Sequence, residues 1–90
     1  MFMEYDNNTL FEDRFASIYP KFVRYLLKRT PNLSPKEVKI SMLIKMNYKN
    51  SDVLQIAGVS KSTLDNMRHN IRKKMKLKRN ENLVLEILKL

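Results

Sequence analysis

The chain has 90 residues, of which 18 are lysine or arginine and nine are aspartate or glutamate, and its net charge is +9. A chain this short buries only about 60 to 65% of its unfolded surface, so we expect one small basic domain without a large enzymatic cleft. The absence of cysteine excludes disulfides and thiolate metal sites. No apolar run approaches the roughly 20 residues of a membrane span, and the first 20 residues are net acidic, opposite to a signal peptide. We therefore expect a soluble, cytoplasmic protein.

The composition predicts an all-α fold. One glycine and three prolines leave few residues for the tight turns of an all-β domain, whereas good helix formers are abundant. The positive charge is concentrated in residues 21–50 and 61–79, each with a net charge of +7. Such blocks suit a polyanion, either nucleic acid or an anionic membrane surface, although charged helix faces also occur simply in contact with water.

Residues 10–29 predict two helices. Apolar residues recur there every three or four positions, which is the helical period, and Pro20 interrupts them. Proline fits the first turn of a helix but not its interior. We therefore expect one helix that ends near residues 17–19 and a second that begins at Pro20 and ends at Thr30.

A third helix is predicted from Pro35 to about Met46. Ser34 can cap it, proline suits its first position, and Glu37 is placed to complete a capping box. Asn47 follows, where a left-handed residue commonly ends a helix. Two apolar stripes predict burial on two sides of this helix, the second against the N-terminal helices. These stripes are Ile40, Leu43 and Ile44, and Val38, Met42 and Met46.

A short helix followed by a tight turn comes next. Asn50 or Ser51 can cap a helix that runs through Ala57. Gly58 is the only glycine of the chain, and Ser60 can cap another helix two residues later. This arrangement predicts a helix-turn-helix unit.

The helix predicted from Lys61 to Lys76 has one apolar and one polar side. The stripe expected to be buried consists of Leu64, Met67, Ile71 and Met75. The opposite face consists of Ser62, Asp65, Asn66, His69, Lys73 and Lys76, flanked by Arg68 and Arg72. Hydrogen-bonding and cationic groups on one face after a glycine turn suit a helix that reads a nucleic-acid groove.

The tail, Asn82 to Leu90, predicts a last helix with more apolar surface than one core-facing stripe needs. The surplus suggests a second buried interface, most simply for self-association, with Leu85 and Leu88 as the first candidates. The alternative is that these leucines are exposed at a frayed terminus.

Residues 33–77, LSPKEVKISMLIKMNYKNSDVLQIAGVSKSTLDNMRHNIRKKMKL, carry a set of residues whose joint spacing is familiar. These are Leu33, Ser34, Glu37, Ile40, Leu43, Ile44, Asn50, Val53, Gly58, Val59, Ser60, Thr63, Leu64, Asn70, Ile71, Lys74 and Met75. In this spacing the chain resembles the LuxR/FixJ/NarL-type helix-turn-helix DNA-binding domain, without a gap. The lead-in Tyr19-Pro20-Lys21-Phe22 is similar to the segment before such domains in Bacteroidetes-type regulators.

The resemblance implies a four-helix domain over residues 33–90, preceded by an N-terminal helical extension over residues 1–32. It implies sequence-specific binding of double-stranded DNA by a recognition helix at about 61–76, in a bacterial transcriptional regulator or its C-terminal output domain, associated with the nucleoid. It also implies a homodimer formed by the last helix through Leu85 and Leu88, and RNA polymerase as a further candidate partner. No membrane, metal, cofactor or small-molecule partner is expected.

The resemblance and the exposed face of the helix together assign two kinds of DNA contact to particular residues. Base reading is assigned to Asp65, Asn66 and His69. Phosphate contact is assigned to Lys61, Ser62, Thr63, Arg68, Arg72, Lys73 and Lys76. Each has a plainer alternative: Asp65 and Asn66 as solvated residues, Thr63 as part of the cap, and Arg68 as the partner of Asp65 or Glu81.

The chain departs from the family's pattern at several positions. Asn47, Leu54 and Met67 stand where the family prefers glycine, a small alanine and histidine, and Leu54 calls for wider packing of the two motif helices. Asp65 stands where several members carry a cation. A carboxylate there repels phosphate but can accept a hydrogen bond from the cytosine amino group, so it would select sequence at a cost in affinity.

Two other functions remain open at this point. One is a promoter-reading domain of the sigma-factor type, and the other is a helical adaptor whose basic faces bind an acidic protein. An enzyme is not expected, because the chain lacks a nucleophile elbow, a phosphate-binding glycine loop and metal-ligand spacing. His69 has no second histidine or cysteine beside it, which argues against a catalytic or metal role.

Overall fold

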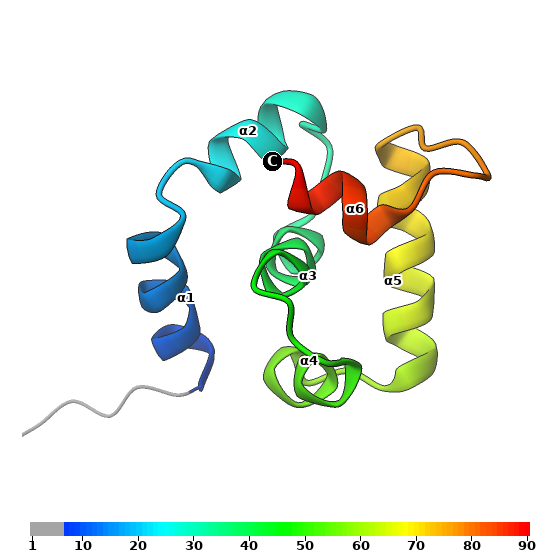
Figure 1. The fold of residues 1–90 in the computed structure, drawn as a ribbon. Coiled ribbons are helices and arrows are strands. Elements are labelled where there is room, and N and C mark those ends of the chain that lie inside the picture. Colours follow the sequence, from blue (N-terminus) through cyan, green and yellow to red (C-terminus); the bar gives the residue numbers. More distant parts are fainter. Residues whose placement is uncertain (1–6) are drawn as a thin grey trace, which may run out of the picture.

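The computed structural model describes residues 7–90, and their side chains from Leu10 onward. This part of the chain is helical and contains no strand, which confirms the all-α prediction (Figure 1). The first six residues of the predicted N-terminal extension lie outside the described residues. Among the described residues, no helix is both long enough and apolar enough to cross a membrane. The helices are α1 (Asn7–Ile18), α2 (Phe22–Arg29), α3 (Pro35–Lys45), α4 (Asn50–Ala57), α5 (Lys61–Lys74) and α6 (Leu83–Leu88).

Helix α3 lies at the centre of the molecule, where it contacts α2, α4, α5 and α6 (Figure 1). All residues from Ile40 to Ile44 are buried, and Val38 and Met46 are partly buried against the core. The prediction that two sides of this helix are buried is therefore confirmed. Inside it, the Ser41 hydroxyl donates to the carbonyl of Glu37 at 2.9 Å, so the one polar residue of the run is satisfied.

Aromatic rings join α1 to α2 and to the segment between α3 and α4. Phe15 contacts Phe22 edge-on at 5.3 Å between ring centroids, and Phe11 contacts Tyr48 edge-on at 5.7 Å. Helix α1 ends where it was predicted to end, but α2 begins at Phe22 rather than at Pro20. Pro20 instead belongs to a turn closed by a hydrogen bond from the Phe22 amide to the Tyr19 carbonyl.

The N-termini of α3 and α5 are capped as predicted, and that of α4 is not. Ser34 and Glu37 form the complete capping box of α3, and Ser60 caps α5. The residue before α4 is Lys49, which makes no capping hydrogen bond. Asn50 is already helical, and its side chain instead accepts a hydrogen bond from Arg68 at 3.3 Å.

Three helices end on a residue in the left-handed conformation. Asn47 (φ 62°) follows α3, as predicted, and Gly58 (φ 67°) follows α4 at the predicted tight turn. Lys76 (φ 58°) follows α5, which therefore ends at Lys74, two residues before the predicted end. Because Lys76 lies beyond the helix, it is no longer part of the polar face predicted for residues 61–76.

Candidate nucleic-acid interface

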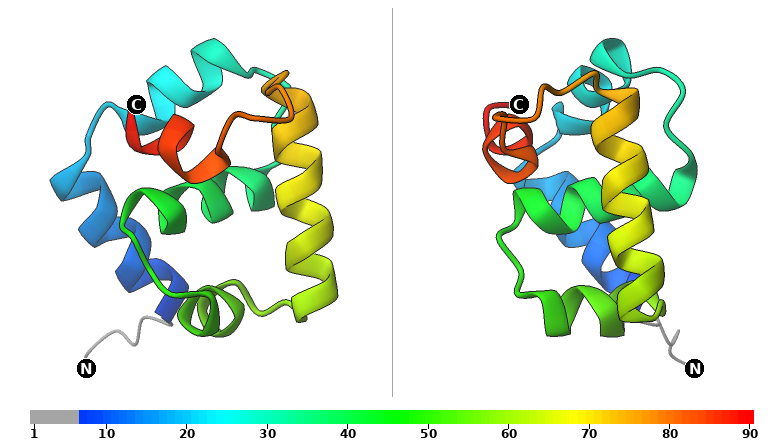
Figure 2. Two further views of the ribbon diagram at one scale, coloured as in Figure 1. Left: turned by 45° about the vertical axis from the view of Figure 1, so that its right-hand side comes forward. Right: turned by 90° about the vertical axis from the view of Figure 1, so that its right-hand side faces the viewer.

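Helix α5 forms one edge of the molecule. It runs crosswise to α4 and follows it after the turn at Gly58 (Figure 1). When the molecule is turned so that this edge faces the viewer, α5 lies in front along most of its height (Figure 2, right). A helix in this position can approach another molecule along its whole length.

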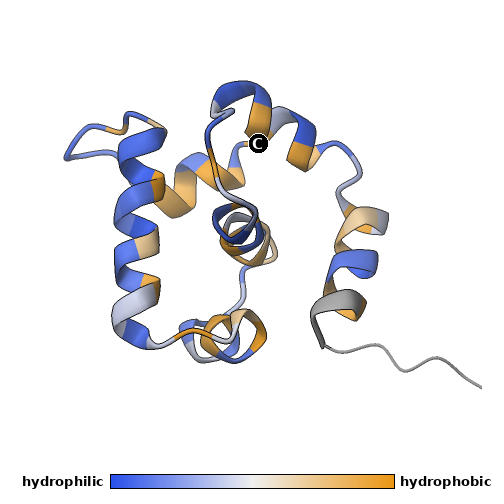
Figure 3. Ribbon diagram, turned by 180° about the vertical axis from the view of Figure 1, so that it is seen from behind, coloured by the Kyte–Doolittle hydropathy of each residue, from blue (hydrophilic) through white to orange (hydrophobic). Residues whose placement is uncertain are grey.

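The inner side of α5 is apolar, as predicted. Leu64, Ile71 and Met75 are buried, and Met67 is partly buried against the core. The hydropathy colouring shows the same division, because α5 is largely hydrophilic with a few hydrophobic positions (Figure 3). Burial of this stripe fixes which residues face outward.

The outer side of α5 is polar and exposed. Its exposed residues are Lys61, Ser62, Thr63, Asp65, Asn66, His69, Asn70 and Lys73. Within the part of the chain that the structure describes, the side chains of Asp65, Asn66, His69 and Lys73 make no hydrogen bond or ion pair. Their donors and acceptors are therefore available to a partner molecule.

The hydroxyl groups at the start of α5 bond to one another. The Ser60 hydroxyl accepts from the Thr63 amide at 3.2 Å and donates to the Thr63 hydroxyl at 3.0 Å. It also lies 3.2 Å from the hydroxyl of Ser62. Thr63 therefore takes part in the cap, as its plainer alternative had it, and the residue is also exposed.

Two arginines of α5 bond within the protein. Arg68 bonds to Asn50 rather than to Asp65 or Glu81, the partners named in its plainer alternative. Arg72 donates to the carbonyls of Glu81 at 2.8 Å and Lys78 at 3.1 Å. Arg72 thus holds the segment that connects α5 to α6, a role that the sequence did not reveal because its acceptors are backbone atoms.

Helix α6 is attached to the body of the protein. Leu83 and Ile87 are buried, and the Asn82 side chain accepts from the Leu85 amide at 3.1 Å. Leu85 and Leu88 remain outside, with 57% and 39% of their surface exposed. Because α6 is capped and packed against α3, the exposure of these leucines does not result from fraying.

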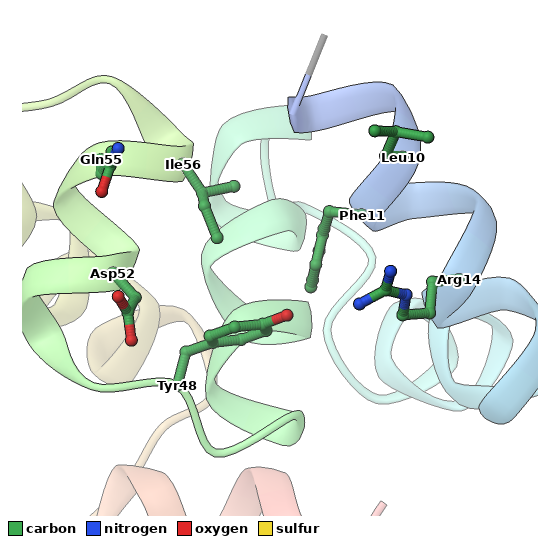
Figure 4. Close-up of a pocket in the computed structure, with 7 residues that line it drawn as sticks. All are labelled: Leu10, Phe11, Arg14, Tyr48, Asp52, Gln55 and Ile56. Carbon is green, nitrogen blue, oxygen red and sulfur yellow. The ribbon is translucent and has the colours of Figure 1, made fainter. Parts of the chain in front are cut away.

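A groove of about 330 Å³ lies between α1 and α4 (Figure 4). Leu10, Phe11 and Ile56, with the ring of Tyr48, form its apolar part. Its polar residues, Arg14, Asp52 and Gln55, make no hydrogen bond to one another among the described side chains.

No group of three or more metal-ligating side chains is found within residues 7–90. No protein-family model matches the chain, no curated protein matches it in sequence, and no solved structure matches it in fold. The function is therefore argued from the residues and geometry of this chain.

Proposed function

We propose that the protein binds double-stranded DNA by inserting α5 into the major groove, as a LuxR-type bacterial transcriptional regulator or its output domain. The observation that supports this most is the outer side of α5, where exposed polar side chains without internal partners line a helix at the edge of the molecule. The B-DNA major groove is about 12 Å wide and admits one α-helix.

Asp65, Asn66 and His69 are the base-reading residues in this proposal. Asn66 can bond to adenine through its amide, and Asp65 can accept from the amino group of cytosine. His69 follows Asp65 by one helical turn, so the two lie on the same side of α5. All three are exposed, so base contact requires no rearrangement of the core.

Phosphate contact is proposed for residues at both ends of α5. Lys61, Ser62 and Thr63 are exposed at its N-terminus, where backbone amides and the helix dipole favour an anion. Lys73 is exposed near its C-terminus, and Lys76 just beyond it. Arg68 and Arg72 contribute charge along the flank, although each also bonds within the protein.

A homodimer through α6 completes the proposal. The exposed side chains of Leu85 and Leu88 can pair with those of a second copy, which would present two α5 helices to one duplex. Dimers of helix-turn-helix domains bind half-sites about one turn of DNA apart. RNA polymerase is a further candidate partner on this reading, and the site of action would be the nucleoid.

The test is fluorescence anisotropy of a labelled random-sequence duplex, titrated with protein at several salt concentrations. The wild-type protein should bind, with an affinity that falls steeply as salt rises. Lys61→Glu combined with Lys73→Glu should weaken binding by at least about tenfold near 100 mM salt, because both side chains would face phosphate. Both residues are exposed, and neither makes a side-chain hydrogen bond or ion pair within the described part of the chain, so the fold should survive.

The matched control is Lys28→Glu combined with Arg24→Glu on α2, which makes the same charge change at two other exposed positions. It should weaken binding by only about two- to threefold through net charge. Absence of wild-type binding at low salt would refute the proposal and favour a protein-binding adaptor. Equal losses in both double variants would show that α5 is not the contact surface.

A further inference from the structure

A second groove, of about 380 Å³, lies between α5 and the segment that leads to α6. Three arginines line it: Arg68 and Arg72 from α5, and Arg79 from the connecting segment. Among the described residues that line it, Glu81 carries the negative charge. Its carboxylate already accepts a hydrogen bond from the Lys78 amide at 2.7 Å. The lining is therefore net positive.

The arginines differ in how firmly they are held. Arg72 is fixed by two backbone carbonyls, which use two of its five N–H donors and leave the others for a ligand. Arg68 makes one long hydrogen bond, to Asn50. Arg79 is exposed and its side chain makes no hydrogen bond or ion pair within the described residues. One fixed guanidinium and two adjustable ones can together surround a small anion.

An adjoining hollow extends this positive surface. It shares Arg68 and Val84 with the groove that the three arginines line, and it adds Lys49 and Asn50 at the start of α4. The cations thus follow the flank of α5 that faces α6, beside its outer polar side. Arg79 and Lys49 belong to the two basic blocks of the sequence, but their place beside α5 depends on the fold.

We propose that the arginine groove of Arg68, Arg72 and Arg79 binds a phosphate group. Guanidinium groups bind phosphate through paired N–H donors, and several of them around one groove suit the multiple acceptor oxygens of a phosphate group. The phosphate can come from the backbone of a duplex bound by α5 or from a free phosphorylated compound. The first source rests on the proposed function, because a helix in the major groove has phosphates along both flanks.

The variant that tests the groove is Arg79→Gln. It removes an exposed cation that makes no side-chain hydrogen bond or ion pair among the described residues, so its effect on folding should be small. Arg24→Gln on α2, also exposed, is the matched control. Duplex affinity of all three proteins is measured across a salt series. If a backbone phosphate occupies the groove, the slope of log affinity against log salt should fall by about 0.9 in Arg79→Gln alone.

An unchanged slope in Arg79→Gln would overturn the groove as a phosphate site while leaving DNA binding by α5 intact. If the wild-type protein binds no duplex, the proposed function fails, and the groove is tested with inorganic phosphate alone. Saturable shifts of the arginine Nε–Hε NMR signals, absent from Arg79→Gln, would then assign the groove to a free phosphorylated compound. No saturable shift would overturn it.

Discussion

Glu37 connects two helices through one carboxylate. Its Oε1 atom accepts from the Ser34 amide at 2.8 Å, which completes the capping box of α3, and from Lys74 of α5 at 2.6 Å. Burial raises the pKa of Glu37, but the hydrogen bonds and the charge of Lys74 outweigh it, so the pKa lies below its usual value. The sequence predicted the capping box from residues three apart, whereas Lys74 is 37 positions away and no local pattern links it to Glu37.

The first prediction is that Glu37→Gln lowers the free energy of unfolding by about 1 to 2 kcal/mol at pH 7. A lowered folded-state pKa gives stability that is present above the unfolded pKa and is lost as pH falls through the folded one. The difference from wild type should therefore shrink below about pH 4. Urea unfolding at pH 7 and pH 3 measures it.

The control is Glu12→Gln. Glu12 pairs with Lys39 at 3.8 Å, with 56% of its side chain exposed, and such surface pairs contribute little. Its removal should change stability by less than about 0.5 kcal/mol. A Glu37→Gln deficit of equal size at both pH values would contradict the ionic role.

At the scale of elements, the helix starts and stops show what a sequence can predict. Asn47 and Gly58 are residues that favour a left-handed conformation, and both adopt it. Lys76 gives no such signal, because lysine also continues a helix well, so α5 was predicted two residues too long. The segment after it is held by Arg72, whose carbonyl acceptors could not be inferred from side-chain types.

We therefore expect Arg72→Gln to destabilise the protein by about 1 to 2 kcal/mol. The shorter glutamine side chain cannot bond both carbonyls, so the partly buried carbonyl of Glu81 loses its donor. Lys73→Gln, one residue further along the same helix, should change stability by less than about 0.5 kcal/mol because Lys73 is exposed. Chemical denaturation of both variants compares them directly. Equal stability would show that Arg72 does not hold the connecting segment.

At the scale of the whole molecule, local periodicity predicted the helices but not how they meet. The amine of Lys45 donates to the carbonyl of Leu88 at 2.9 Å and lies 5.0 Å from the centre of the Tyr19 ring. This one side chain thus joins α3 to α6 and to the segment between α1 and α2. Arg29 of α2 adds a pair with Glu86 of α6 at 3.4 Å. Such contacts join residues far apart in the sequence and depend on how the helices pack. The residues on the polar face of α5 could therefore be predicted from the sequence, whereas the residues from other segments that lie beside it could not.

The exposed leucines of α6 decide how strongly two copies of the molecule can associate. Leu85 and Leu88 leave a small apolar surface on a helix that is itself firmly attached. A stable dimer buries about 1,200 Å² or more, far beyond what two leucines supply, so self-association through α6 should be weak. In sedimentation equilibrium the average mass should rise above 10.8 kDa only at high protein concentration, on the order of 100 μM.

Leu85→Glu combined with Leu88→Glu should hold the mass at 10.8 kDa at every concentration, because paired copies would then bring like charges together. Leu10→Glu is the control, since Leu10 is a leucine of similar exposure, 50%, on α1. It should still associate. A wild-type mass that never rises would exclude α6 as a dimer surface in the free protein, and a loss of association in Leu10→Glu would move the contact to α1.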